Sequence, residues 1–206
     1  MANRRIALKI HQTRPSTAGK NRRDAEMKQS SLTLDQFIGE LQRLAARNFS
    51  VRETHNFLKD ALVRPEQLKP YLFVAPDQYT RNLIYKSPEF ELLLIAWPAG
   101  HGAPIHGHEG EKCWARVERG ELRFTNYCEI PNCHSFSLKH ISERIGGLGY
   151  LDGPADIHKV ENTSREIALT LHLYSRPFEA CDIYDPQSGR KFRRTLEYYS
   201  QFGKRI

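Results

Sequence analysis

Two histidines stand one residue apart in the segment PIHGHEGEKCW, which spans residues 104–114. Side chains at positions i and i+2 of an extended strand project to the same side, so His106 and His108 would present two imidazoles together. Imidazole ligation suits iron, zinc, copper or nickel, which makes the pair a candidate metal site. The pair alone is weak evidence, because two solvent-facing histidines would give the same pattern.

The spacing around this pair resembles the first motif of the cupin superfamily. That motif here consists of Gly100, His106, His108, Cys113 and Gly120. Downstream, His158 and Asn162 resemble the end of the second cupin motif, so a distant strand supplies a third histidine. Most metal-binding cupins have a glutamate ligand at the position of Cys113. The resemblance therefore implies three neutral imidazoles without a carboxylate, a site that favours anionic ligands from a substrate and would ionise a bound thiol.

Four segments, taken in order, resemble the cysteine dioxygenase family. They read YTRNLIY at 79–85, AGHGAPIHGHEGEKCW at 99–114, IHKVENTS at 157–164 and LTLHLYSRPF at 169–178. The similarity extends from about Tyr71 to Asp182. It implies a mainly β fold of the cupin type, a jelly-roll barrel with N-terminal helices packed on it.

The resemblance also assigns roles to individual residues. It implies that His106, His108 and His158 bind Fe(II). It implies that Arg81 binds the substrate carboxylate, whose geometry matches the guanidinium fork, with Tyr79 nearby. The alternative for Arg81 is a structural ion pair with an internal acid.

The strand IALTLHLY, residues 167–174, alternates in polarity, so Thr170, His172 and Tyr174 project to the same side. The resemblance implies that the hydroxyl of Tyr174 points toward substrate and oxygen, supported by His172 and Thr170. The family usually has serine at the position of Thr170, and either hydroxyl can form a hydrogen bond.

In animal members of the family, a cysteine at the position of Cys113 joins this tyrosine through a thioether. Because both residues are present, we expect a protein-derived crosslink between Cys113 and Tyr174. The alternative is a buried free thiol. The family often has Ser-Pro-Pro after the tyrosine, whereas Ser175-Arg176-Pro177 stands here, which weakens the expectation of a cis peptide at 175–176.

The activity implied by the resemblance is the iron-dependent oxidation of L-cysteine with O2 to cysteine sulfinate, a step in cysteine catabolism. One alternative is a dioxygenase of 3-mercaptopropionate, in which the arginine is typically a glutamine. A second alternative is a metal-dependent cupin isomerase, or a non-catalytic cupin that binds a small molecule.

The N-terminal third of the domain predicts two amphipathic helices. The first shows apolar residues at helical spacing, namely Leu34, Phe37, Ile38, Leu41 and Leu44. Thr33 or Ser31 could cap it. Ser50 and Glu53 form a capping-box pattern ahead of a second helix that would run to about Leu62.

After Tyr71 the chain predicts strands. Residues 79–85, 90–97 and 167–174 form three of them, and the run at 90–97 is apolar enough to be covered on both faces. Residues 113–127 predict a hairpin that turns at Arg119–Gly120. Many short strands with frequent turns favour a sandwich or barrel.

Composition and charge place limits on the class of protein. The net charge is +7, but residues 1–23 hold seven Lys or Arg and no acid, and the remaining 24 basic residues balance the 24 acidic ones. We therefore expect a basic, disordered tail at 1–30, a single domain at 31–206 with a helical segment at about 31–70, and no nucleic-acid partner. The alternative for the tail is an organelle-targeting peptide. The chain lacks a long apolar run and a secretory pattern, and its four cysteines form no CxxC pair. We expect a cytoplasmic, non-membrane protein, monomeric, whose partners are L-cysteine and O2.

Overall fold

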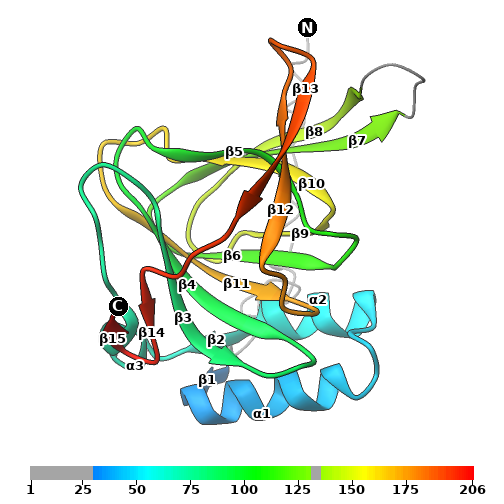
Figure 1. Cartoon of the computed structure of the whole chain (residues 1–206). Helices are drawn as coiled ribbons and strands as arrows, with labels where there is room; N and C mark the ends of the chain where they lie inside the picture. The colour runs from blue at the N-terminus through cyan, green and yellow to red at the C-terminus, as the bar shows by residue number, and fades with distance from the viewer. Residues whose placement is uncertain (1–29, 131–135) are drawn as a thin grey trace, which may run out of the picture.

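The computed structural model describes residues 30–130 and 136–206. The predicted basic tail, residues 1–30, therefore lies outside the described residues except for Ser30. Figure 1 shows two β-sheets that face each other, with the N-terminal helices packed along one of them.

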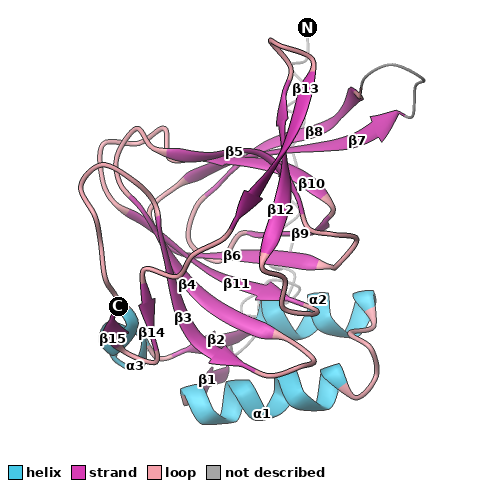
Figure 2. Ribbon diagram, viewed as in Figure 1, coloured by secondary structure: helices cyan, strands magenta, loops and turns pink. Residues whose placement is uncertain are grey.

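Two sheets make up most of the fold, and Figure 2 shows their strands as two layers. The seven-stranded sheet contains, in spatial order, β15 (Lys204–Arg205), β14 (Ser200–Gln201), β3 (Thr80–Lys86), β4 (Glu91–Trp97), β11 (Ala168–Tyr174), β6 (Cys113–Arg119) and β9 (Leu151–Ala155). The six-stranded sheet contains β13 (Arg190–Thr195), β12 (Ala180–Asp185), β5 (Gly102–Gly107), β10 (Ile157–Glu161), β7 (Leu122–Ile130) and β8 (Ser137–Gly146). The predicted mainly β jelly-roll fold is confirmed, as a sandwich in which no ladder joins the two sheets among the described strands.

Two helices cover the outer face of the seven-stranded sheet. They are α1 (Leu34–Ala45) and α2 (Val51–Asp60), and they are followed by the short α3 (Pro65–Leu68) and the 3-10 turn η1 (Lys69–Tyr71). Strands β1 (Ser30–Leu32) and β2 (Ala61–Val63) pair in parallel beside them. No helix in this described part of the chain is long and apolar enough to cross a membrane.

Alternation along the strands divides the core into two layers. The outer layer, against the helices, contains Phe37, Leu41, Leu92, Leu94, Leu171 and Leu173. The inner layer, between the sheets, contains Leu93, Ile95, Trp97, Ala115, Val117 and Phe124. Because Leu171 and Leu173 face the helices, the alternate residues of β11 project between the sheets. This places Thr170, His172 and Tyr174 on the inner side, as the sequence predicts.

The capping box forms at the first helix and not at the second. The Thr33 hydroxyl accepts a hydrogen bond from the Gln36 backbone, and the Gln36 side chain accepts one from the Thr33 backbone. The predicted box at Ser50 and Glu53 is wrong, because Ser50 makes no side-chain cap and Glu53 instead lies 3.3 Å from an Arg47 nitrogen. The second helix also ends at Asp60, two residues before the predicted end, because residues 61–63 pair as β2.

The predicted hairpin at Arg119–Gly120 is wrong. Strands β6 and β7 follow each other in sequence but belong to different sheets, β6 pairing with β11 and β9 and β7 with β10 and β8. The chain crosses between the sheets at Gly120, whose φ is 75°. A Cβ there would lie 2.9 Å from Ala168, so both the conformation and the close approach favour glycine. Both strands contribute apolar residues to the inner layer. The alternation of apolar and polar residues is therefore the same whether the two strands form a hairpin or the chain crosses from one sheet to the other.

A buried arginine fastens the helices to the sheet. Arg116 on β6 is 1% exposed and projects toward α2. Its Nη1 donates to the carbonyl oxygens of Leu58 and Ala61, and its Nε lies 2.6 Å from a Glu118 oxygen. The guanidinium thus satisfies carbonyl groups that the end of a helix leaves without partners.

Candidate metal centre

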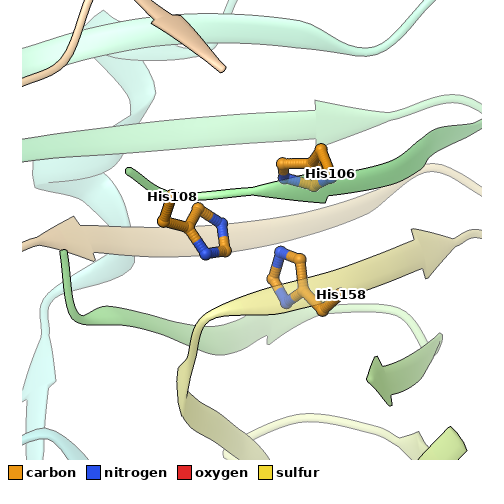
Figure 3. A group of neighbouring side chains, drawn as sticks. All are labelled: His106, His108 and His158. Atoms are coloured by element: carbon orange, nitrogen blue, oxygen red, sulfur yellow. The ribbon is translucent and has the colours of Figure 1, made fainter. Parts of the chain in front are cut away.

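Three histidines converge between the sheets. His106 lies on β5, His108 follows the end of that strand, and His158 lies on β10 as the register partner of His106. Their ring centroids are 4.7–5.0 Å apart, and one nitrogen from each lies within 4.8 Å of the others. Figure 3 shows the three rings pointing toward one another. The structure therefore brings together the three residues that the sequence predicts.

The hydrogen bonds of these rings fix which nitrogen faces the common centre. His106 Nδ1 lies 2.9 Å from the Pro104 carbonyl oxygen, and His108 Nδ1 lies 3.1 Å from that of Ala155. A carbonyl oxygen only accepts hydrogen bonds, so each Nδ1 donates and each Nε2 keeps a free lone pair. His108 Nε2 is fully buried and has no hydrogen-bond partner within residues 30–130 and 136–206. A ring of this kind is arranged as a metal ligand with its tautomer set by a second contact.

The third histidine faces a buried carboxylate. Asp152 on β9 is 5% exposed, and its Oδ2 lies 3.6 Å from His158 Nδ1. Neither atom has a hydrogen-bond partner among the described residues, and His158 Nε2 has none either. The other oxygen of Asp152 accepts a hydrogen bond from Asn126 at 3.1 Å, which orients the carboxylate. This Asp–His pair matches the arrangement in which a carboxylate orients a metal-binding imidazole.

Electrostatics keep the three rings neutral. Burial lowers the pKa of His106 to about 4, and it lowers the pKa of His108 and of His158 well below the usual value. Neutral imidazole is the form that binds metal. The donor set, the orphaned Nε2 atoms and the neutral rings together fit a divalent transition metal.

Cys113 belongs to a second group of potential ligand atoms with His158 and His172. Burial and the nearby Asp152 raise the pKa of the Cys113 thiol well above its usual value, so the protonated thiol is favoured. On the sheet, Cys113 lies directly opposite Tyr174, because the two are register partners across β6 and β11. Cys113 thus has Tyr174 beside it on the same face of the sheet, as well as His158 and His172.

A hydrogen-bonded series runs along the inner face of β11. The Trp97 indole N–H donates to the Thr170 hydroxyl at 2.9 Å, and this hydroxyl lies 3.0 Å from His172 Nδ1. The ring of His172 is 5.8 Å from that of Tyr174, which in turn is 5.7 Å from that of His108. The strand thus carries Tyr174 to the edge of the histidine cluster, with His172 and Thr170 behind it.

A cavity opens beside the histidines. It is lined by Tyr79, Arg81, Trp97, His106, His172, Tyr174, Phe178, Cys181, Arg194 and Leu196, among others. A second hollow, nearer the surface, shares Tyr79, Arg81, Arg194 and Leu196 with it. The ring of Tyr79 stacks on Trp97 with centroids 5.1 Å apart, and burial raises the pKa of its hydroxyl. The predicted substrate residues Arg81 and Tyr79 therefore both face the cavity.

Arg81 also forms a buried ion pair with an internal acid, which the sequence analysis gave as the alternative to binding of the substrate carboxylate. Its Nη2 lies 3.2 Å from a Glu91 oxygen, and the two side chains are 7% and 0% exposed. The guanidinium still lines both hollows, so the ion pair and a role at the cavity coexist. Sequence reasoning missed Glu91, Asp152 and Arg194. The signal for Glu91 was available, because it is an acid inside a strand that otherwise reads as buried.

Comparison with known proteins identifies the family. The family model described as cysteine dioxygenase type I matches residues 24–187. The chain belongs to the cysteine dioxygenase type I family. It is 31% identical to human cysteine dioxygenase type 1 over 169 residues, which cover 80% of this chain and 84% of the relative. The rat protein is 32% identical over 179 residues, which cover 84% and 89%. The family expected from the sequence is confirmed.

The comparison with solved structures gives weaker similarities, with TM-scores below 0.5. Protein TT1209 from Thermus thermophilus is 21% identical with a TM-score of 0.44, over 53% of this chain and 93% of that protein. A cupin superfamily protein from Desulfitobacterium hafniense is 13% identical with a TM-score of 0.39, over 52% and 84%.

Proposed function

We propose that this member of the cysteine dioxygenase family is an Fe(II)-dependent enzyme that oxidises L-cysteine with O2 to cysteine sulfinate. The observation that carries the proposal is the orientation of the histidines. His106, His108 and His158 each turn Nδ1 toward an oxygen of the protein, which leaves three Nε2 atoms for one ion. A site with three neutral ligands and no carboxylate leaves room for an anionic thiolate.

The reaction balances without a further reductant. Both atoms of dioxygen are added to the sulfur, and the oxidation of the thiol to a sulfinate equals the reduction of the dioxygen. Bound iron would supply the activation of dioxygen and of the thiol. The protein's share is to bind the rest of the substrate, to orient it and to keep water out of the buried site.

Arg81 and Tyr79 are the residues that we assign to the substrate carboxylate. A guanidinium has five N–H donors, and the pair with Glu91 uses Nη2 alone. Other donors remain for a carboxylate in the cavity that Arg81 and Tyr79 line. A carboxylate held there would bring the thiol of a short amino acid toward the histidines.

Tyr174 is the residue that we assign to proton and orientation control at the reacting atoms. It lines the cavity, and burial raises the pKa of its phenol well above the usual value, so the hydroxyl remains a donor. His172 and Thr170 position it from the same face of β11. Cys113 would limit the movement of the ring through the predicted thioether. The monomeric state and the cytoplasmic location also stay predictions.

The experiment that tests the proposal measures oxygen uptake by purified protein loaded with Fe(II). L-cysteine, cysteamine and 3-mercaptopropionate are compared at matched iron content, and metal-free and zinc-loaded protein serve as controls. We expect iron-dependent uptake that is fastest with L-cysteine, with one sulfinate formed per dioxygen. Fastest uptake with 3-mercaptopropionate would shift the assignment to that substrate, and no uptake with any thiol would refute it.

A further inference from the structure

A buried ionic network contacts Arg81. Its centre is Glu91, the first residue of β4, which is 0% exposed and does not line the cavity. Glu91 alternates along β4 with the same spacing as Leu93, Ile95 and Trp97, whose side chains lie in the inner layer. Its side chain therefore projects to that same face of the sheet. Across the sheet it is the register partner of Tyr174. The acid Glu91 therefore lies on the strand next to Tyr174, the residue that we assign to control of the reacting atoms.

Both oxygens of Glu91 accept hydrogen bonds. Oε1 accepts from Arg81 Nη2 at 3.2 Å, and Oε2 accepts from the hydroxyl of Tyr198 in the C-terminal segment. Lys86 Nζ donates to that same hydroxyl oxygen at 3.1 Å, which directs the hydroxyl proton toward Glu91. Burial raises the pKa of Glu91 above its usual value, while Arg81, the hydrogen bond from Tyr198 and Lys86 oppose that rise. Two donated hydrogen bonds and an adjacent guanidinium stabilise the ionised carboxylate. The Tyr198 ring also lies under the guanidinium, 5.2 Å from Arg81 Cζ.

This network has two consequences for a ligand of Arg81. The guanidinium is held from one side by Glu91 and from below by Tyr198, so its remaining donors are fixed in direction. At the same time the negative charge of Glu91 offsets the positive charge of Arg81, so the pair attracts an anion less than Arg81 alone would. A substrate carboxylate that approaches Arg81 also approaches the Glu91 anion. Like charges that share one site repel each other strongly when they are buried.

We propose that Glu91 is a specificity-determining residue, which orients Arg81 but reduces its preference for thiols that carry a carboxylate over thiols that do not. This inference rests on the proposed function, because it concerns the substrate of that same site. It concerns how the site discriminates between small aminothiols with and without a carboxylate. Glu91 is not among the residues that line the cavity, so it acts on the carboxylate through its charge and through the orientation of Arg81, and it is not a catalytic residue.

The test replaces Glu91 with its neutral isostere. Glu91→Gln keeps an acceptor for Arg81 and a polar partner for Tyr198 but removes the charge. Cysteine and cysteamine are titrated calorimetrically into Fe(II)-loaded protein without oxygen at about pH 8, and KM and kcat are then measured in air. We expect the Kd and KM for cysteine to fall about tenfold, those for cysteamine to change less than about twofold, and kcat to stay nearly constant.

The matched control is Glu89→Gln, the same substitution at an exposed acid two residues earlier. It should leave the ratio between the two thiols unchanged. An unchanged or lower preference for cysteine in Glu91→Gln would overturn the inference, as would an equal change for both thiols. If Glu91→Gln does not fold, the neutral pair Arg81→Gln/Glu91→Gln replaces it. That variant should bind the two thiols within about threefold of each other, and retention of any larger wild-type preference would overturn the inference.

The binding measurement separates this inference from the proposed function. Wild-type protein that binds both thiols but consumes no oxygen would refute the dioxygenase activity while the calorimetry still decides the role of Glu91. Wild-type protein that binds neither thiol would overturn both.

Discussion

Cys113 and Tyr174 lie directly opposite each other on the antiparallel strands β6 and β11, and their side chains are 1% and 4% exposed. Opposite residues on such strands have Cβ atoms about 4.5–5.5 Å apart. The sheet therefore places the two side chains next to each other on its inner face.

We predict that this pair forms a thioether during turnover. The thiol and one ring carbon each lose a hydrogen as the sulfur–carbon bond forms, and dioxygen takes up the two hydrogens. Intact protein incubated with Fe(II), O2 and cysteine should become lighter by two hydrogen atoms, and activity should rise with the crosslinked fraction. Cys181→Ala should keep the mass loss and Cys113→Ala should abolish it. Unchanged mass of the wild type after many turnovers would contradict the prediction.

His106→Ala and His158→Ala should each lose most of the bound iron and all measurable activity. Each substitution removes one of the three nitrogens that face the common centre. Iron is measured by elemental analysis after gel filtration. His101→Ala is the control, because the His101 ring contacts the Ala99 carbonyl through Nδ1 and is not among the residues that line the cavity. Stoichiometric iron in both ligand variants would rule out this metal site.

Asp152→Asn should weaken metal binding by about 10- to 100-fold, because the carboxylate that orients His158 is lost. The affinity is obtained by competition with a chelator of known strength. Asp156→Asn removes an equal charge from an exposed position and should leave the affinity unchanged. Equal affinities for all three proteins would mean that Asp152 has no part in orienting the ligand.

Arg81→Ala should reduce kcat/KM for cysteine far more than for cysteamine. Breaking a buried charge pair costs about 3–5 kcal/mol, which corresponds to about two to four orders of magnitude in kcat/KM. The substitution also leaves Glu91 without its counter-ion, so the melting temperature should fall as well. The loss of stability affects both substrates alike, and the comparison of the two thiols isolates the carboxylate. A similar loss for both would mean that Arg81 only supports the fold.

Arg116→Ala should lower the free energy of unfolding by about 3–5 kcal/mol. It leaves Glu118 without its buried partner and two carbonyl groups near the end of α2 without a donor. Denaturant titration measures the change, and Arg119→Ala, at an exposed position on the same strand, is the control. A loss no larger than that of the control would show that packing alone holds α2 on the sheet.

Local geometry indicated the pair His106 and His108 and the inner face of β11, whereas His158 entered the predicted site only through the resemblance to the family. The i, i+2 spacing of His106 and His108 and the alternation around His172 determine where the side chains project once a strand forms. Local geometry does not determine which strand pairs with which. The residues after Arg119 could turn back along β6 or cross to the other sheet, and the hydrophobic pattern is the same in both cases.

The ionic partners of the site could not be read from the sequence for a similar reason. Glu91 meets Arg81 because β3 and β4 pair antiparallel, and it meets Tyr198 because the C-terminal segment runs beside them. Asp152 meets His158 across the space between the sheets. Each of these contacts depends on how the strands are placed relative to one another, which neither propensity nor spacing specifies.

The origin of the oxygen atoms in the product tests the central claim most directly. Fe(II)-loaded protein is incubated with L-cysteine under 18O2 in ordinary water, and the product is analysed by mass spectrometry. The account predicts cysteine sulfinate in which both oxygens of the sulfinate group carry the heavy isotope. Cystine as the main product, or a sulfinate with oxygen from water, would contradict it.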